Sequence, residues 1–146
     1  MRIAVNIVRV FLGLLFLASS VTYFLDLVPA PEMEGDLRTF NEGLMASRYL
    51  FPLVKTVELV VAIAFLSGRF VPLAVVLLFP VTVNIFLVHL FLDPGGLPLA
   101  IVVLTSHLFL AFACWAHFQK LLAPRIEFSH QPPFSEPSGS AAENKN

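Results

Sequence analysis

The hydrophobic pattern of the chain is dominated by four long apolar runs, at residues 3–25, 49–66, 70–92 and 97–118. A helix needs roughly 20 residues, at about 1.5 Å each, to cross about 30 Å of hydrocarbon. All four runs are close to that length, and a helix satisfies its own backbone hydrogen bonds in lipid. We therefore predict an all-α membrane protein with four transmembrane helices in an up-down antiparallel bundle.

Prolines lie near the starts of the last three runs, and short polar turns separate them. Pro52, Pro72 and Pro98 fall in the first turns of the second, third and fourth runs, where a missing N–H costs little. Residues 67–69 (Ser-Gly-Arg) and 93–96 (Asp-Pro-Gly-Gly) separate the last three runs. Connections this short predict that consecutive helices lie side by side and antiparallel.

The first connection, residues 26–48, is longer and amphipathic. Leu37, Phe40 and Leu44 have the spacing of one helical face. We predict a short interfacial helix in this first outer loop, lying on or dipping into the membrane surface. The alternative is an irregular loop.

Composition supports a membrane protein and narrows its partners. Hydrophobic residues make up 58% of the chain and charged residues 13%, whereas soluble domains carry about 25% charged residues. The net charge of -1 offers no basic surface for a nucleic acid. Residues 123–146 are rich in Pro, Ser, Asn and Glu, so we predict a disordered cytoplasmic tail after a transmembrane domain at 1–122.

The Lys and Arg residues predict the orientation, because cytoplasmic flanks carry an excess of them. With the N-terminus inside, the inner flanks hold Arg2, Arg9, Arg69, Lys120 and Arg125. The outer side holds Arg38, Arg48 and, just within the membrane, Lys55. Both termini are therefore predicted to be cytoplasmic.

A few polar residues fall inside the runs, where each is costly. Counting along the helices places Glu58, Asn84 and His107 near mid-membrane, with Lys55 just above them and Arg9 nearer the inner face. One interpretation is a buried polar pocket that binds a ligand or protons. The other is structural, because polar side chains also bridge membrane helices at about 0.6 kcal/mol each. For Arg9, snorkelling to the inner head groups is favoured.

The sequence gives little sign of a bound metal or cofactor. His89, His107 and His117 lie at different depths on the same count, so one ion could not collect them, and we predict no metal site. The chain also lacks a phosphate-binding loop, a serine-nucleophile motif and a dinucleotide fingerprint.

Several motifs together resemble the DoxX family of small bacterial membrane proteins, over about residues 3–122. They are Arg9-x-x-x-Gly13, Phe51-Pro52-Leu53-x-Lys55-x-x-Glu58, Gly68-Arg69-Phe70-Val71-Pro72, Pro80-x-x-x-Asn84 and His89-Leu90-Phe91-Leu92-Asp93-Pro94-x-Gly96. The resemblance implies a four-helix protein of the bacterial inner membrane. The family takes its name from a subunit linked to thiosulfate:quinone oxidoreduction. The resemblance implies functional roles only for the polar positions that match the family's motifs: Arg9, Lys55, Glu58, Asn84 and His89.

Three functions fit these observations. The first is a non-enzymatic membrane accessory or subunit protein that associates with a membrane or redox partner or with itself. The second is a membrane subunit of a quinone-linked oxidoreductase, in which Glu58 and His107 exchange protons with the head group while Lys55 or Asn84 hydrogen-bonds its carbonyl. A small-solute carrier is disfavoured, because paired inverted halves are not visible in the sequence.

Overall fold

The computed structural model describes residues 2–28 and 33–121, and every regular element in those ranges is a helix. The helices are α1 (Arg2–Phe24), α2 (Gly35–Ala46), α3 (Leu50–Ser67), α4 (Val71–Phe91), α5 (Leu97–Ala113) and α6 (Trp115–Leu121), with a 3₁₀ turn, η1 (Pro94–Gly96), before α5. The residues predicted to form the disordered tail, 123–146, lie outside the described ranges.

Four of these segments are long and apolar enough to cross a membrane: α1, α3, α4 and the combined segment Pro94–Ala113. Only 22% of each apolar stretch is buried inside the protein. The rest of each helix therefore presents apolar side chains outward, which is expected only where lipid replaces water. The predicted all-α membrane fold is confirmed.

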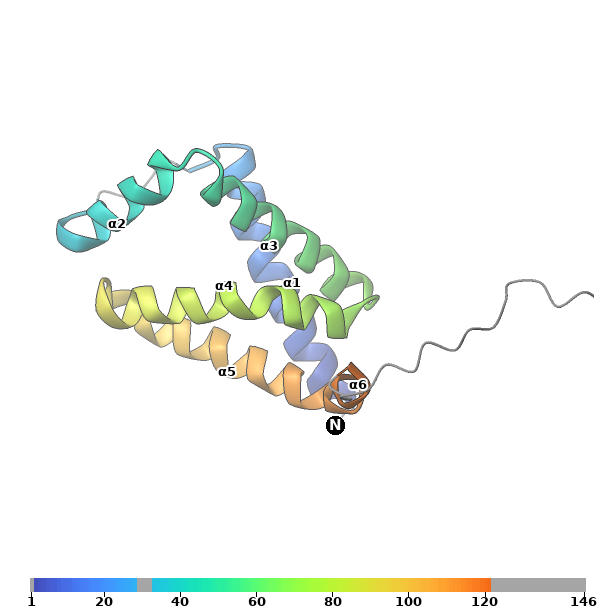
Figure 1. Ribbon diagram of the computed structural model, residues 1–146. Coiled ribbons are helices and arrows are strands. Elements are labelled where there is room, and N and C mark those ends of the chain that lie inside the picture. Colours follow the sequence, from blue (N-terminus) through green and yellow to red (C-terminus); the bar gives the residue numbers. More distant parts are fainter. Residues whose placement is uncertain (1, 29–32, 122–146) are drawn as a thin grey trace, which may run out of the picture.

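The four long helices form a closed ring of neighbours. α1 packs mainly against α3 and α4 mainly against α5, while α3–α4 and α1–α5 contacts complete the ring. In Figure 1, α4 and α5 run alongside each other, whereas α3 diverges from α4 with distance from the turn that joins them. The helix α2 lies over the wide end of this divergence and contacts α3.

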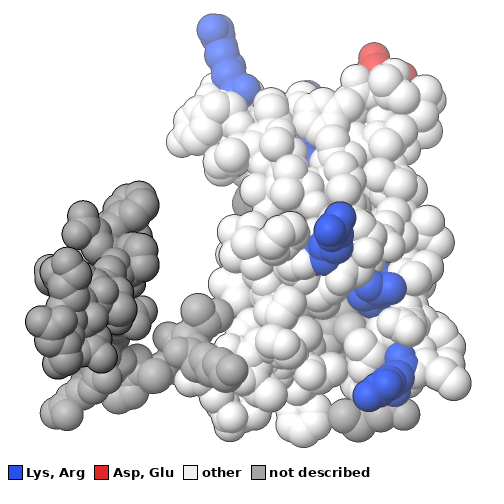
Figure 2. Space-filling model, turned by 90° about the vertical axis from the view of Figure 1, so that its right-hand side faces the viewer, with Lys and Arg blue, Asp and Glu red and all other residues white. Residues whose placement is uncertain are grey.

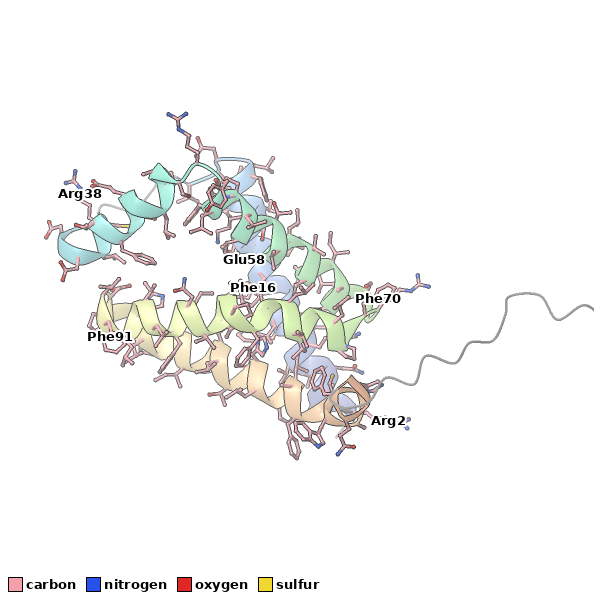
Figure 3. The ribbon with its side chains drawn as sticks, viewed as in Figure 1. Arg2, Phe16, Arg38, Glu58, Phe70 and Phe91 are labelled. Atoms are coloured by element: carbon pink, nitrogen blue, oxygen red, sulfur yellow. The ribbon has the colours of Figure 1, made fainter. Side chains whose placement is uncertain are left out.

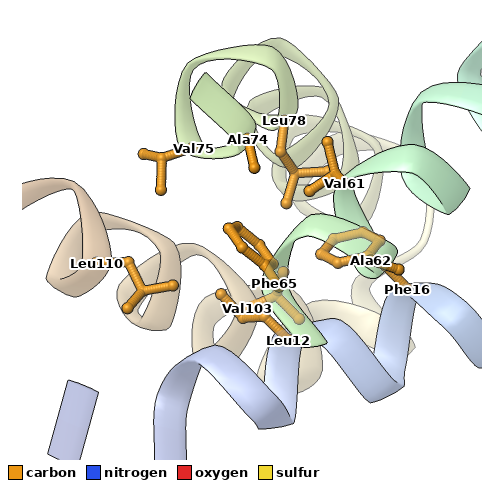
Figure 4. Packing of buried hydrophobic residues seen from close by; sticks show 10 residues of the cluster. All are labelled: Leu12, Phe16, Val61, Ala62, Phe65, Ala74, Val75, Leu78, Val103 and Leu110. Carbon is orange, nitrogen blue, oxygen red and sulfur yellow. The ribbon is translucent and has the colours of Figure 1, made fainter. Parts of the chain in front are cut away.

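The core draws on all four long helices, as Figure 4 shows. Its buried members are Leu12 and Phe16 of α1, Val61, Ala62 and Phe65 of α3, Ala74, Val75 and Leu78 of α4, and Val103 and Leu110 of α5. Gly13 permits the close approach of α1 and α3, because a Cβ there would lie 2.9 Å from the Leu66 side chain. Small residues commonly serve this purpose between membrane helices.

The turn between α3 and α4 depends on one glycine. Gly68 directly follows the last residue of α3, and its φ of 71° lies in the left-handed region that glycine adopts without a steric penalty. Phe70 follows with a φ of 57° and directly precedes α4. Pro72 and Pro98 occupy the first turns of α4 and α5, as the sequence predicts.

The short helix predicted in the first long connection is present as α2. Leu37, Phe40 and Leu44 are partly buried on its inner side, whereas Arg38 and Glu42 are exposed and joined by an Nε–Oε1 contact of 2.7 Å. The hydrogen bond and charge of Glu42 raise the pKa of Arg38. α2 is thus amphipathic, with its apolar side toward the bundle.

The fourth apolar run, predicted as one helix over 97–118, divides into two. α5 ends at Ala113, the backbone leaves helical geometry at Cys114 (φ -90°, ψ 3°), and α6 begins at Trp115. Beyond Ala113 the sequence becomes mixed, with His, Gln and Lys beside Trp and Phe. Such a segment suits an interface better than hydrocarbon, since Trp and basic side chains favour the head-group level.

Candidate ligand-binding cavity

A buried ion pair lies in the N-terminal half of α3, on the side facing α1. Lys55 and Glu58 are three residues apart on one helical face, and Lys55 Nζ lies 2.9 Å from Glu58 Oε2. Ser19 of α1 completes the cluster: its hydroxyl accepts from Lys55 Nζ at 2.8 Å and donates to Glu58 Oε2 at 3.1 Å. Figure 3 shows Glu58 inside the assembly, in contrast to Arg38 at the outer edge of α2. The carboxylate, only 2% exposed, is therefore paired as a buried charge must be.

This ion pair lies on the wall of a cavity of about 520 Å³ between α2, α3 and α4. The cavity occupies the wedge where α3 and α4 diverge beneath α2. Its volume is in the range of small-molecule sites, roughly 300–1,000 Å³. Most of the wall is apolar: Met33, Leu37, Phe40, Leu44, Leu50, Phe51, Leu53, Val54, Val57, Leu77, Pro80, Val81, Ile85 and Val88. Asn41, Lys55, Glu58, Asn84 and His89 are the polar lining residues.

Two polar side chains of α4 lie on the opposite wall. Asn84 is exposed, and its amide makes no hydrogen bond within the described part of the chain. His89 lies one helical turn before Asp93, and its Nδ1 is 3.0 Å from Asp93 Oδ2. Gly96 leaves space for the imidazole, because a Cβ at that position would overlap the His89 ring. In the neutral imidazole that donates its Nδ1 proton to Asp93, Nε2 is an acceptor.

His107 belongs to a separate hydrogen-bonded group between α4 and α5. It is fully buried, and its Nε2 donates to the carbonyl oxygen of Val75 at 3.1 Å. Its Nδ1 lies 3.0 Å from the Thr82 hydroxyl, which is also 3.2 Å from the carbonyl oxygen of Leu78. Because a carbonyl oxygen can only accept, Nε2 carries a proton. Both ring nitrogens are thus engaged with protein groups, and His107 does not line the cavity.

Arg9 lies apart from the cavity, at the other end of the bundle. Its guanidinium passes over Gly68 in the α3–α4 turn, where a Cβ would overlap Nη1. The Nε atom of Arg9 is buried without a hydrogen-bond partner in the described residues. Arg9 is therefore not part of the polar lining around Glu58.

The structure thus brings together four of the six residues singled out from the sequence: Lys55, Glu58, Asn84 and His89. It places His107 and Arg9 elsewhere. The sequence reasoning missed Ser19, which gave no signal beyond a hydroxyl in an apolar run, and Asp93, whose i,i+4 spacing to His89 was a usable signal. Across residues 2–28 and 33–121, no group of three His, Cys, Asp or Glu side chains could hold a metal ion.

The fold and cavity define a multi-pass helical membrane protein with a mainly apolar, partly open cavity that is lined by a few polar groups. A comparison with protein families matches the DoxX family over residues 4–90, more than half of the chain, and the chain therefore belongs to that family. The matched range includes all four polar residues named above and ends before Asp93 and His107. Neither curated proteins nor solved structures gave a significant match.

Proposed function

We propose that this protein is a non-enzymatic subunit of a membrane complex, and that it contributes a binding site for a quinone-type ligand in the α2–α3–α4 cavity. The observation that carries the proposal is the placement of Lys55, Glu58, Asn84 and His89 around one otherwise apolar cavity of about 520 Å³. An apolar cavity with a few convergent polar groups is the usual form of a small-molecule site. A membrane-soluble ligand can reach it from the bilayer.

The hydrogen-bonding capacity of the walls favours a ligand whose head group alternates between carbonyl and hydroxyl. Lys55 has three N–H donors, and two are directed to Ser19 and Glu58, which leaves one for a carbonyl oxygen. Asn84 offers both a donor and an acceptor. Glu58 Oε1 makes no hydrogen bond in the described residues, and Nε2 of a neutral His89 is an acceptor, so either can accept a hydrogen bond from a hydroxyl group. A quinone and its quinol need both kinds of group.

His89 takes the role in this proposal that the sequence suggested for His107. The imidazole of His107 is held by Val75 and Thr82, whereas His89 faces the cavity and is oriented by Asp93. The chain itself supplies no electrons in the proposed scheme. A redox protein associated with the apolar outer surface would supply or accept them, which is why we propose a subunit.

Asn84 offers the cleanest test of the site, because its side chain is exposed and its removal should leave the fold intact. We expect the purified full-length protein in nanodiscs to bind a short-chain benzoquinone saturably, and Asn84→Leu to weaken binding roughly tenfold, the effect of about 1.4 kcal/mol. Isothermal titration calorimetry would measure both affinities.

The matched control for this test is Thr105→Val. Thr105 is an exposed α5 residue bonded only to its own helix, at the carbonyl of Ile101, and it lies outside the cavity. We expect this variant to bind like the unmodified protein. Absence of saturable binding, or equal affinities for the Asn84 and Thr105 variants, would remove the quinone site.

We also propose that the protein resides in the bacterial inner membrane with both termini in the cytoplasm. The support is the distribution of basic residues: Arg2, Arg9 and Arg69 all lie at the α1-start and α3–α4-turn end of the bundle, opposite α2. In spheroplasts of a Cys114→Ser background, a membrane-impermeant maleimide should label Glu42→Cys at once and Gln119→Cys only after lysis. Both positions are exposed, so the opposite labelling order would reverse the topology.

A further inference from the structure

Two arginines without acidic partners among the described residues lie at the α3–α4 turn, one from α1 and one from the turn itself. Arg9 reaches the turn from α1 and lies over Gly68, and the next residue in the chain is Arg69, which is exposed. Within residues 2–28 and 33–121 neither arginine forms an ion pair, since the ion pairs found there involve Arg38, Lys55 and His89. The turn therefore brings together two positive charges on adjacent parts of the fold, and an anion beside them would be attracted to both.

The end of the bundle around this turn carries basic but no acidic side chains among the described residues. Figure 2 looks onto it: separate Lys and Arg side chains stand on a mostly uncharged face, and acidic atoms appear only at the upper margin. Figure 3 places Arg2 and Phe70 on this same side of the protein. The acidic residues of the described ranges lie elsewhere, at Asp26, Glu34, Asp36, Glu42, Glu58 and Asp93.

An apolar groove runs from this basic end along the outside of α3 and α4. It has a volume of about 330 Å³ and is lined by side chains such as Val60, Ile63, Leu73 and Leu77, all exposed. Ser67 and Arg69 lie at one end of it. From Val60 to Ser67 the helix advances about 10 Å, enough for part of an acyl chain beside the helix.

We propose that the turn and the groove together bind one anionic phospholipid of the leaflet that meets this end of the bundle. Its phosphate interacts with Arg69 and the outer edge of the Arg9 guanidinium. One acyl chain lies along the α3–α4 groove. An anionic lipid is favoured over a zwitterionic one, because the latter brings its own cation to a site that already holds two.

Lipid retention in native mass spectrometry tests this site with the full-length protein. After reconstitution in phosphatidylcholine nanodiscs with added phosphatidylglycerol, we expect one phosphatidylglycerol to stay bound. Arg69→Gln should weaken its retention roughly tenfold. Arg69 is exposed at the surface, so the variant should still fold.

Two further variants separate the head-group contact from general attraction and from the groove. Arg48→Gln removes an exposed charge at the opposite end of the bundle and should retain the lipid fully. Ala64→Phe fills the groove without changing charge and should weaken retention as Arg69→Gln does. Equal retention by the two arginine variants, no effect of Ala64→Phe, equal binding of phosphatidylcholine, or displacement by inorganic phosphate alone would each overturn the proposal.

Discussion

Replacing Lys55 with methionine is expected to destabilise the folded protein by about 3–5 kcal/mol, the usual cost of leaving one member of a buried ion pair without its partner. The Glu58 carboxylate is 2% exposed, and it accepts its shortest hydrogen bond, at 2.9 Å, from Lys55. Ser19 alone cannot compensate the charge. Reversible unfolding in mixed micelles, followed by circular dichroism during titration with dodecyl sulfate, would measure the loss.

The double variant Lys55→Met/Glu58→Gln should recover most of this loss, because no uncompensated charge remains. Arg38→Met is the matched control, since it breaks a pair with Glu42 in which both side chains are exposed. It should leave the unfolding free energy essentially unchanged. If Lys55→Met is no more costly than the double variant, the two residues are not energetically coupled, and the ion pair does not stabilise the fold.

That coupling also bears on the two interpretations of the polar residues, structural or functional. A strong Lys55–Glu58 coupling shows a structural contribution, yet the third Lys55 donor and Glu58 Oε1 stay available to a ligand. His107 differs, because its two ring nitrogens are both bonded to α4. The cavity residues can therefore serve a ligand and the fold together, whereas His107 fits a purely structural bridge between α4 and α5.

Most of the fold could be predicted because a helix that spans hydrocarbon must have both a minimum length and an apolar composition. The first three long helices, Arg2–Phe24, Leu50–Ser67 and Val71–Phe91, begin and end within one residue of the runs predicted at 3–25, 49–66 and 70–92. Pro52 and Pro72 mark the starts of the second and third of these helices and Gly68 follows the end of the second, and such residues give strong local signals. The break at Cys114 has neither Gly nor Pro beside it. The apolar pattern therefore predicts one uninterrupted helix to Phe118.

The candidate site was less predictable, because depth along a helix does not fix the direction of a side chain. Counting residues placed Glu58, Asn84 and His107 in one layer, but the rotation of each helix about its axis and the divergence of α3 from α4 separate them. Glu58 and Asn84 border the cavity, while His107 lies in the α4–α5 interface. The angle between helices depends on packing of complementary surfaces, which a single sequence does not reveal.

Replacing Gly68 with alanine is expected to lower the unfolding free energy through two separate effects. A Cβ is unfavourable at a φ of 71° by roughly 1–2 kcal/mol. The same Cβ would overlap Arg9 Nη1, and displacing that side chain should cost about 1–3 kcal/mol more. Unfolding in mixed micelles would measure the sum.

Gly35→Ala isolates the first effect, because Gly35 has a φ of 58° and no atom within 4 Å of the position of its Cβ. It should show the conformational cost alone. Adding Arg9→Ala to Gly68→Ala should remove the second effect and bring the loss close to that of Gly35→Ala, after correction for Arg9→Ala by itself. Equal losses for the two glycine variants would mean that Arg9 moves aside freely, and that the α3–α4 turn does not hold its guanidinium in place.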